Sequence, residues 1–175
     1  MASLRIIGLI LLAALAYGIA HDQVTVRLSL EYFTIVHPPL VPTRSPTLLA
    51  FGWGIAATWW LALPVGVLLA AAARLGARPK LTATDLRGPI GRLLVVMALG
   101  AILSGIIGAL LASRGYVWLV PRLAELIAPD RHLRFLAALW AHNASYAIGL
   151  VGTLILAVGL WRRRGRHPHA SLTAT

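Results

Sequence analysis

Four long apolar segments with almost no charged residues are the feature that most constrains the fold of this 175-residue chain. They cover about residues 4–20, 47–73, 93–112 and 135–161. Each is long enough to cross the hydrocarbon core of a bilayer. Because backbone polar groups in lipid must be satisfied within the segment, each is predicted as a helix. The sequence therefore predicts an all-α membrane protein, with residues 1–175 forming a single four-helix transmembrane bundle.

Composition supports a membrane protein and excludes several other classes. Hydrophobic residues make up 59% of the chain and charged residues only 12%, which is more apolar than a soluble domain needs. The net charge of +11 does not indicate nucleic-acid binding, because the basic residues cluster at the ends of apolar segments rather than on one water-facing surface. The chain has no cysteine, which excludes disulfides, thiol catalysis and cysteine-based metal sites.

The distribution of basic residues predicts the orientation of the helices. The stretch before the first helix, the loop 74–92 and the tail 162–175 together carry ten basic residues and one acid, whereas the loops 21–46 and 113–134 carry six basic residues and four acids. Basic residues favour the cytoplasmic side of a membrane. We therefore expect both termini and the loop 74–92 in the cytoplasm of a bacterial cell, with the other two loops outside its inner membrane.

The first helix has an alternative interpretation. Residues 1–20 combine Arg5, a short apolar run and the small residues Gly18-Ile19-Ala20, which is also the pattern of a cleaved secretory signal. Cleavage would leave three helices, with the sidedness of the rest unchanged.

The outer loops are predicted to form a short ordered cap. Apolar residues alternate with polar ones from Gln23 to Tyr32, a period-two pattern typical of a strand, so a β-hairpin within residues 23–37 is one expectation. The alternative is an irregular connector. In the second outer loop, Pro121 suits the first turn of a short surface helix.

Small residues predict which helices pack together. Gly100, Ser104 and Gly108 lie on one face of the third helix, and Ser145, Gly149 and Thr153 on one face of the fourth. Small residues at four-residue spacing let membrane helices approach closely, so these two helices are predicted neighbours. In the second helix, Pro64 and Gly66 predict a bend. The deeper tryptophans Trp59 and Trp60 are either lipid-facing filler or an aromatic wall for a bound ligand.

A polar stripe in the fourth helix is the main candidate for a functional site. His142, Ser145 and Tyr146 share a helical face, with Asn143 beside them. Polar side chains within a membrane helix must face protein or a wet cavity, which makes them functional candidates. The alternative is an interhelical hydrogen-bond network that only fixes the packing.

A metal site is a second hypothesis for the same region. His21, Glu31 and His37 lie on the same predicted side of the membrane as His142, and imidazole with carboxylate suits a transition metal. The spacing matches no compact metal motif. Haem ranks below a small metal ion, because only His142 lies clearly within a helix and two facing histidines would be needed. His21 and Asp22 are expected at the interface, where they would cap the first helix.

The first outer loop and the second apolar segment contain the runs His21-Asp22-Gln23-Val24-Thr25, Glu31-Tyr32-Phe33-Thr34-Ile35, His37-Pro38, Ser45-Pro46-Thr47 and Trp53-Gly54. With these runs, about residues 21–73 resemble small uncharacterised bacterial inner-membrane proteins. The resemblance implies a multi-pass inner-membrane protein and no particular activity.

Three classes of function follow from the sequence. The first is an outward-facing polar site that binds a small ligand, a metal ion or a partner protein. The second is a membrane metal or redox enzyme that uses the outer histidines and Glu31. The third is a structural accessory subunit that docks onto a larger membrane complex or onto further copies of itself. All three place the chain in a lipid bilayer.

Overall fold

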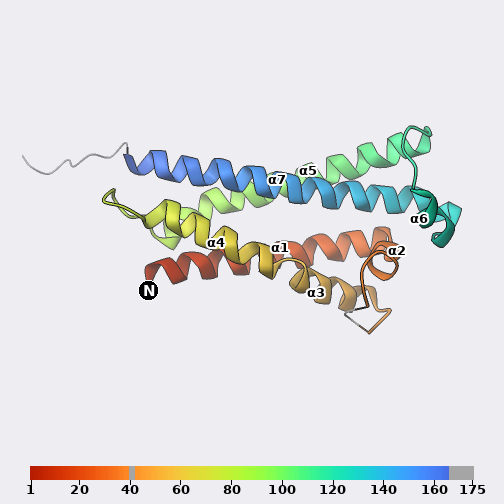
Figure 1. Ribbon diagram of the computed structural model, residues 1–175, viewed down its shortest axis with the longest axis horizontal. Coiled ribbons are helices and arrows are strands. Elements are labelled where there is room, and N and C mark those ends of the chain that lie inside the picture. Colours follow the sequence, from red (N-terminus) through yellow and green to blue (C-terminus); the bar gives the residue numbers. More distant parts are fainter. Residues whose placement is uncertain (40–41, 166–175) are drawn as a thin grey trace, which may run out of the picture.

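The computed structural model describes residues 1–39 and 42–165, and nearly all of them are helical (Figure 1). In chain order the elements are α1 (Ala2–Leu28), α2 (Leu30–Thr34), α3 (Pro46–Ala56), α4 (Trp59–Arg74), α5 (Ala83–Ser113), α6 (Pro121–Leu126), the 3-10 turn η1 (Pro129–Arg131) and α7 (His132–Gly165). The predicted all-α fold is confirmed for these residues. The end of the predicted tail, from residue 166 onward, lies outside them.

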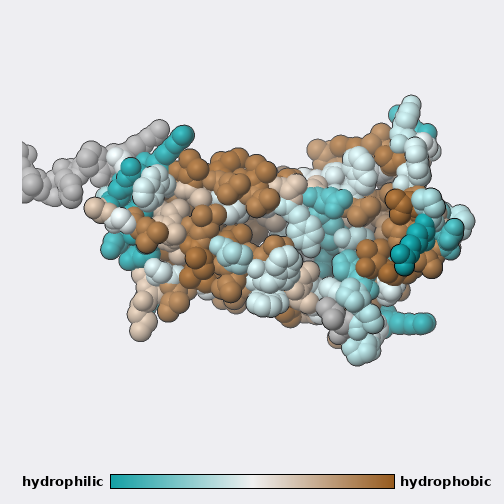
Figure 2. Space-filling view, in the orientation of Figure 1, coloured by the Kyte–Doolittle hydropathy of each residue, from teal (hydrophilic) through white to brown (hydrophobic). Residues whose placement is uncertain are grey.

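Within the described residues, four helical segments are long and apolar enough to cross a membrane: Ala2–Leu28, Pro46–Arg74, Ala83–Ser113 and Pro129–Gly165. Large apolar side chains such as Leu99 and Ile102 of α5 are about 60% exposed, which suits contact with lipid tails. Hydrophobic residues cover wide areas of the visible face, whereas hydrophilic residues gather at its two ends and in a zone just right of the middle (Figure 2). These observations support a multi-pass membrane protein.

Close contact between α5 and α7 depends on glycine. A Cβ atom added at Gly108 would lie within 3 Å of the Trp140 side chain, and one at Gly105 would lie 3.2 Å from the Ala137 carbonyl oxygen. Ser104 Oγ donates a hydrogen bond to the Trp140 carbonyl across the same interface (3.1 Å). The two helices run side by side (Figure 1), so the predicted pairing of the third and fourth helices is confirmed.

The interior consists of two apolar clusters with buried polar residues between them. At the end of the bundle that carries α2 and α6, Tyr32, Phe33 and Trp53 pack with Phe135. At the other end, Ile6 and Ile10 of α1 pack with residues of α4, α5 and α7. Along α7, the buried His142, Ser145 and Thr153 fall between the two clusters.

The expected β-hairpin within residues 23–37 is wrong. No strand occurs among the described residues, and α1 continues through Ala20 to Leu28 before α2 begins. The residues buried in this stretch are Asp22, Thr25, Val26 and Ser29, which recur at the three- and four-residue spacing of a helix face. The apolar Val24, which contributed to the alternating pattern, is 67% exposed. The alternation therefore did not reflect burial.

Other helix bounds also differ from the predicted ones. The third helix begins at Ala83 rather than near residue 93, because Thr82 and Asp85 form a capping box. The backbone N–H and the Oγ of Thr82 both donate to the Asp85 carboxylate (2.8 and 2.7 Å), which satisfies orphan donors at the helix start. The second span is interrupted between α3 and α4 at Ala57–Thr58, ahead of Pro64, which lies inside α4.

Candidate functional site

His142 is held in one orientation by its own helix. Its ring is 5% exposed, and its Nδ1 lies 2.9 Å from the carbonyl oxygen of Ala138, one turn earlier in α7. Because a carbonyl oxygen only accepts, Nδ1 carries the hydrogen and donates it. The other ring nitrogen, Nε2, then points out of α7 toward α1.

The carboxylate of Asp22, on α1, lies next to His142 Nε2. Its Oδ1 lies 3.2 Å from His142 Nε2, and both side chains are buried. In a neutral ring with a hydrogen on Nδ1, Nε2 carries a lone pair, and a carboxylate oxygen is also an acceptor. Two acceptors at this distance require either a proton or a metal ion between them. A proton on the ring gives an imidazolium and a carboxylate, and a proton on Asp22 gives a neutral carboxylic acid that donates to Nε2.

His21, the neighbour of Asp22 on α1, completes the cluster. Its ring meets the His142 ring edge to face, with centroids 4.5 Å apart. The Nε2 atom of His21 is buried and has no hydrogen-bond partner in the part of the chain that the structure describes. One ligand atom from each of His21, Asp22 and His142 lies within 4.8 Å of the others. We call these three residues the His-Asp-His cluster.

Aromatic rings cover the cluster toward the cap. The Tyr32 ring of α2 stacks on His142, with centroids 4.3 Å apart, and Phe33 packs edge to face on it at 5.8 Å. Burial raises the pKa of the Tyr32 phenol, so this ring stays uncharged at neutral pH. The cap thus lowers the access of water to the cluster and strengthens electrostatic interactions inside it.

A pair of hydroxyl groups lies on the opposite side of the cluster. Tyr17, one helical turn before His21, stacks on the His21 ring at 5.9 Å. Its hydroxyl lies 2.7 Å from Ser145 Oγ, which comes from the turn of α7 after His142. The two helices are therefore joined by polar contacts over two turns.

Close backbone packing positions α1 for these contacts. A Cβ atom added at the buried Gly54 of α3 would lie 2.7 Å from the backbone of Ile19, so glycine is required for α3 to approach α1 this closely. Ile19 is two residues from His21. The α1–α3 contact therefore fixes the height and rotation at which His21 and Asp22 face α7.

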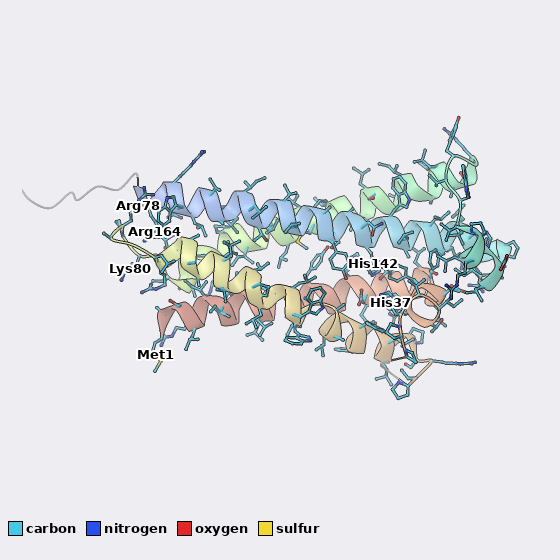
Figure 3. All side chains as sticks on the ribbon, viewed as in Figure 1. Met1, His37, Arg78, Lys80, His142 and Arg164 are labelled. Atoms are coloured by element: carbon cyan, nitrogen blue, oxygen red, sulfur yellow. The ribbon has the colours of Figure 1, made fainter. Side chains whose placement is uncertain are left out.

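The structure brings together only some of the residues predicted for a metal site. His21 and His142 are in contact, as described above. His37 lies outside the cluster: its Nδ1 is 2.7 Å from the Tyr32 carbonyl, and its ring contacts Tyr32 and Trp53. Figure 3 shows His37 and His142 at the same end of the bundle. Glu31 instead accepts a hydrogen bond from Ser29 Oγ (2.9 Å).

The predicted polar and aromatic residues divide between interior and surface. Ser145 is buried, at 5% exposure, whereas Tyr146 is 49% exposed and Asn143 is also exposed. Trp59 and Trp60 are exposed by 52% and 55%, so their rings face outward near the start of α4 rather than the cluster.

Sequence reasoning missed the role of Asp22. It was expected only to cap the first helix at the membrane interface, whereas α1 continues past it. The signal that identifies Asp22 is its helical spacing with Thr25, Val26 and Ser29, all buried. A carboxylate on the buried face of an apolar helix needs a partner.

A pocket of about 470 Å³ opens beside the aromatic cover. Phe33, His37 and Trp53 form part of its wall, and Arg44 lies at its rim. Phe33 therefore lies both in the pocket wall and in the aromatic cover over the His-Asp-His cluster.

These geometric observations stand without support from known relatives. Comparisons with protein-family models, with curated proteins and with solved structures found no match.

Proposed function

We propose that this protein is a multi-pass membrane protein that binds one transition-metal ion between His21, Asp22 and His142. The ion would lie inside the bundle, in the half nearer to α2. Two imidazoles and one carboxylate suit zinc, iron(II), manganese and cobalt. Ligand bonds are about 2 Å long, so the separations of up to 4.8 Å between the ligand atoms need only small side-chain rotations to close around an ion.

The buried Nε2 of His21 is the observation that carries this proposal. A proton shared between Asp22 and His142 would satisfy those two groups and leave His21 without a partner. A metal ion would satisfy all three. The hydrogen bond from His142 Nδ1 to Ala138 also supports an ion, since it fixes the tautomer that presents a lone pair on Nε2.

The number of ligands bears on what the metal would do. Zinc sites that serve only structure usually have four protein ligands, whereas catalytic sites keep a position for water or substrate. Three protein ligands thus favour a metal that can take a further ligand, which keeps a metal enzyme as the second candidate. The edge-to-face contact of the two rings favours a single small ion over haem, whose porphyrin plane would have to separate them.

Metal analysis of the purified protein tests the proposal. Protein in detergent would be stripped with a chelator, incubated separately with zinc, iron(II), manganese or cobalt(II), and freed of unbound ion. We expect about one ion per chain, and visible d–d absorption for cobalt(II). His21→Ala and His142→Ala should each lower the affinity by at least about tenfold, because each removes a ligand.

His37→Ala is the matched control, since His37 lies near the cluster and donates to a backbone carbonyl instead. It should bind metal as the unmodified protein does. Failure to take up any of the four ions, or uptake that His21→Ala leaves unchanged, would show that the proposal is wrong. The cluster would then be an Asp22–His142 ion pair with a structural role.

We further propose a bacterial inner membrane as the location, with both termini in the cytoplasm. The ten basic residues and one acid of the predicted inner segments support this sidedness. Under this orientation the His-Asp-His cluster lies in the outer half of the bundle. An accessory role is a separate alternative, for which the exposed Trp59 and Trp60 offer a docking surface.

A further inference from the structure

Arg164 is a buried cation near the end of α7. It is 1% exposed, and its guanidinium donates to carbonyl oxygens of the α4 end and the following loop. The acceptors are Ala72 and Leu75 (both 2.8 Å), Pro79 (2.7 Å) and Arg78 (3.1 Å). These bonds tie the loop to α7. They engage four of the five N–H donors of Arg164 but do not neutralise its charge.

No carboxylate neutralises this charge within residues 1–39 and 42–165. The ion pairs found there are Arg131–Asp130 and His142–Asp22, both remote from Arg164. The acid at this end of the bundle, Asp85, accepts from Thr82. Arg78 is a second cation in this region. Its guanidinium lies over the Trp161 ring, 4.5 Å from the ring centroid, and donates to the Trp161 carbonyl. Buried or clustered cations without a counterion are costly, so an anion would be favourable here.

A groove of about 340 Å³ lies next to these cations, because its wall includes Trp161, whose ring Arg78 and Arg164 contact at 4.5 and 5.5 Å. It lies between α4 and α7, and its wall is almost entirely apolar: Leu68, Ala71, Ala72, Ala157, Val158 and Trp161. The groove exists because these alanine side chains are small, and larger side chains would fill it. Arg162 is at its polar end. Figure 3 shows Arg78 and Arg164 together at the end of the bundle that also carries Met1.

We propose that this groove binds an anionic phospholipid. One acyl chain would lie along the alanines, and the phosphate would lie beside Arg78 and Arg162, where it would neutralise the local charge. Free phosphate would match the cations but not the apolar groove. A neutral lipid would match the groove but not the cations. The two features meet at Trp161 and Arg162, and an anionic phospholipid matches both.

Fluorescence quenching at Trp161 tests this proposal. The full chain would be reconstituted in nanodiscs of phosphatidylcholine with a small fraction of brominated phosphatidylglycerol or, separately, brominated phosphatidylcholine. The signal of Trp161 is the part of the emission that Trp161→Phe removes. We expect the brominated phosphatidylglycerol to quench Trp161 at a lower mole fraction than the brominated phosphatidylcholine does.

Two variants test the cationic part and the apolar part of the proposed site separately. Arg162→Gln should weaken the preference for the anionic lipid by about fivefold, which corresponds to one arginine near a membrane surface. Ala71→Phe should reduce quenching by either lipid, because it fills the groove. The controls are Arg134→Gln and Ala147→Phe, at exposed positions of α7 away from the groove, and both should behave as the unmodified protein.

Equal quenching by the two lipids would overturn the proposal, because it would mean ordinary lipid contact. Displacement of the brominated phosphatidylglycerol by millimolar inorganic phosphate would also overturn it, because it would mean a free-anion site. So would quenching that neither Arg162→Gln nor Ala71→Phe alters.

Discussion

Asp22 is the residue whose environment distinguishes a metal site from a plain ion pair. Its carboxylate and His142 Nε2 lie 3.2 Å apart with no room for bulk water. Asparagine has nearly the same shape, but its carboxamide is uncharged and can donate a hydrogen bond. A metal site therefore predicts that Asp22→Asn removes metal binding, whereas a plain ion pair predicts that metal has no effect on either protein.

We predict that Asp22→Asn abolishes metal binding without unfolding the protein. The asparagine amide can donate to the lone pair of a neutral His142, so the metal-free variant should unfold at about the same temperature as the metal-free original. The original should gain thermal stability from bound metal, as mass action requires, and the variant should not. Thermal unfolding in detergent with and without zinc measures both effects. Stabilisation by zinc that persists in the variant would contradict a role of Asp22 as a metal ligand.

Single residues also show what sequence reasoning could and could not reach. His21 and His142 were found as candidates because a histidine in or beside an apolar segment is conspicuous. Their contact could not be predicted, since it depends on how α1 and α7 rotate against each other. Glu31 and His37 were grouped with them because all lie on one predicted side of the membrane. Sidedness alone does not determine which side chains meet.

At the scale of helices, the close approach of α1 and α3 depends on Gly54. The Cα of Gly54 is so near Ile19 that an added Cβ would lie 2.7 Å from backbone atoms, which cannot move aside like a flexible side chain. Because Ile19 precedes His21 by two residues, a change at position 54 should reach the His-Asp-His cluster without altering any ligand.

We predict that Gly54→Ala lowers both the unfolding temperature and the metal affinity of the protein. The added methyl group must push α3 from α1 and shift His21 and Asp22 against His142. Gly159→Ala in α7 is the control, because an added Cβ there meets nothing within 4 Å. Metal titration and thermal unfolding of the two variants provide the comparison. Equal behaviour would mean that the α1–α3 contact does not position the cluster.

The helices themselves were predictable because twenty apolar residues in lipid have few structural options. Their ends were not, since polar residues can continue a helix beyond the hydrocarbon. The stretch from His21 to Leu28 illustrates this: its alternating pattern fitted a strand, yet its buried residues follow a helix face. The start of α5 was predictable in principle, because Thr82 and Asp85 stand at the spacing of a capping box.

At the scale of the whole molecule, the charge distribution predicts a sidedness that labelling can check. The chain has no native cysteine, so single cysteines can be introduced without background. We predict that a membrane-impermeant maleimide labels cysteine at position 44 or 116 in intact spheroplasts, and labels position 80 only after the membrane is opened. Labelling of position 80 in intact spheroplasts would contradict the proposed orientation.

The His-Asp-His cluster also joins two helices that are far apart in the sequence. Two of its members come from α1 and the third from α7, so contacts of this kind span most of the sequence. During translation, α1 leaves the ribosome long before α7 is synthesised. A product that stops before α7 could insert its earlier helices into the membrane, but it would lack His142. The ion binding proposed above would therefore require that α1 and α7 have come together.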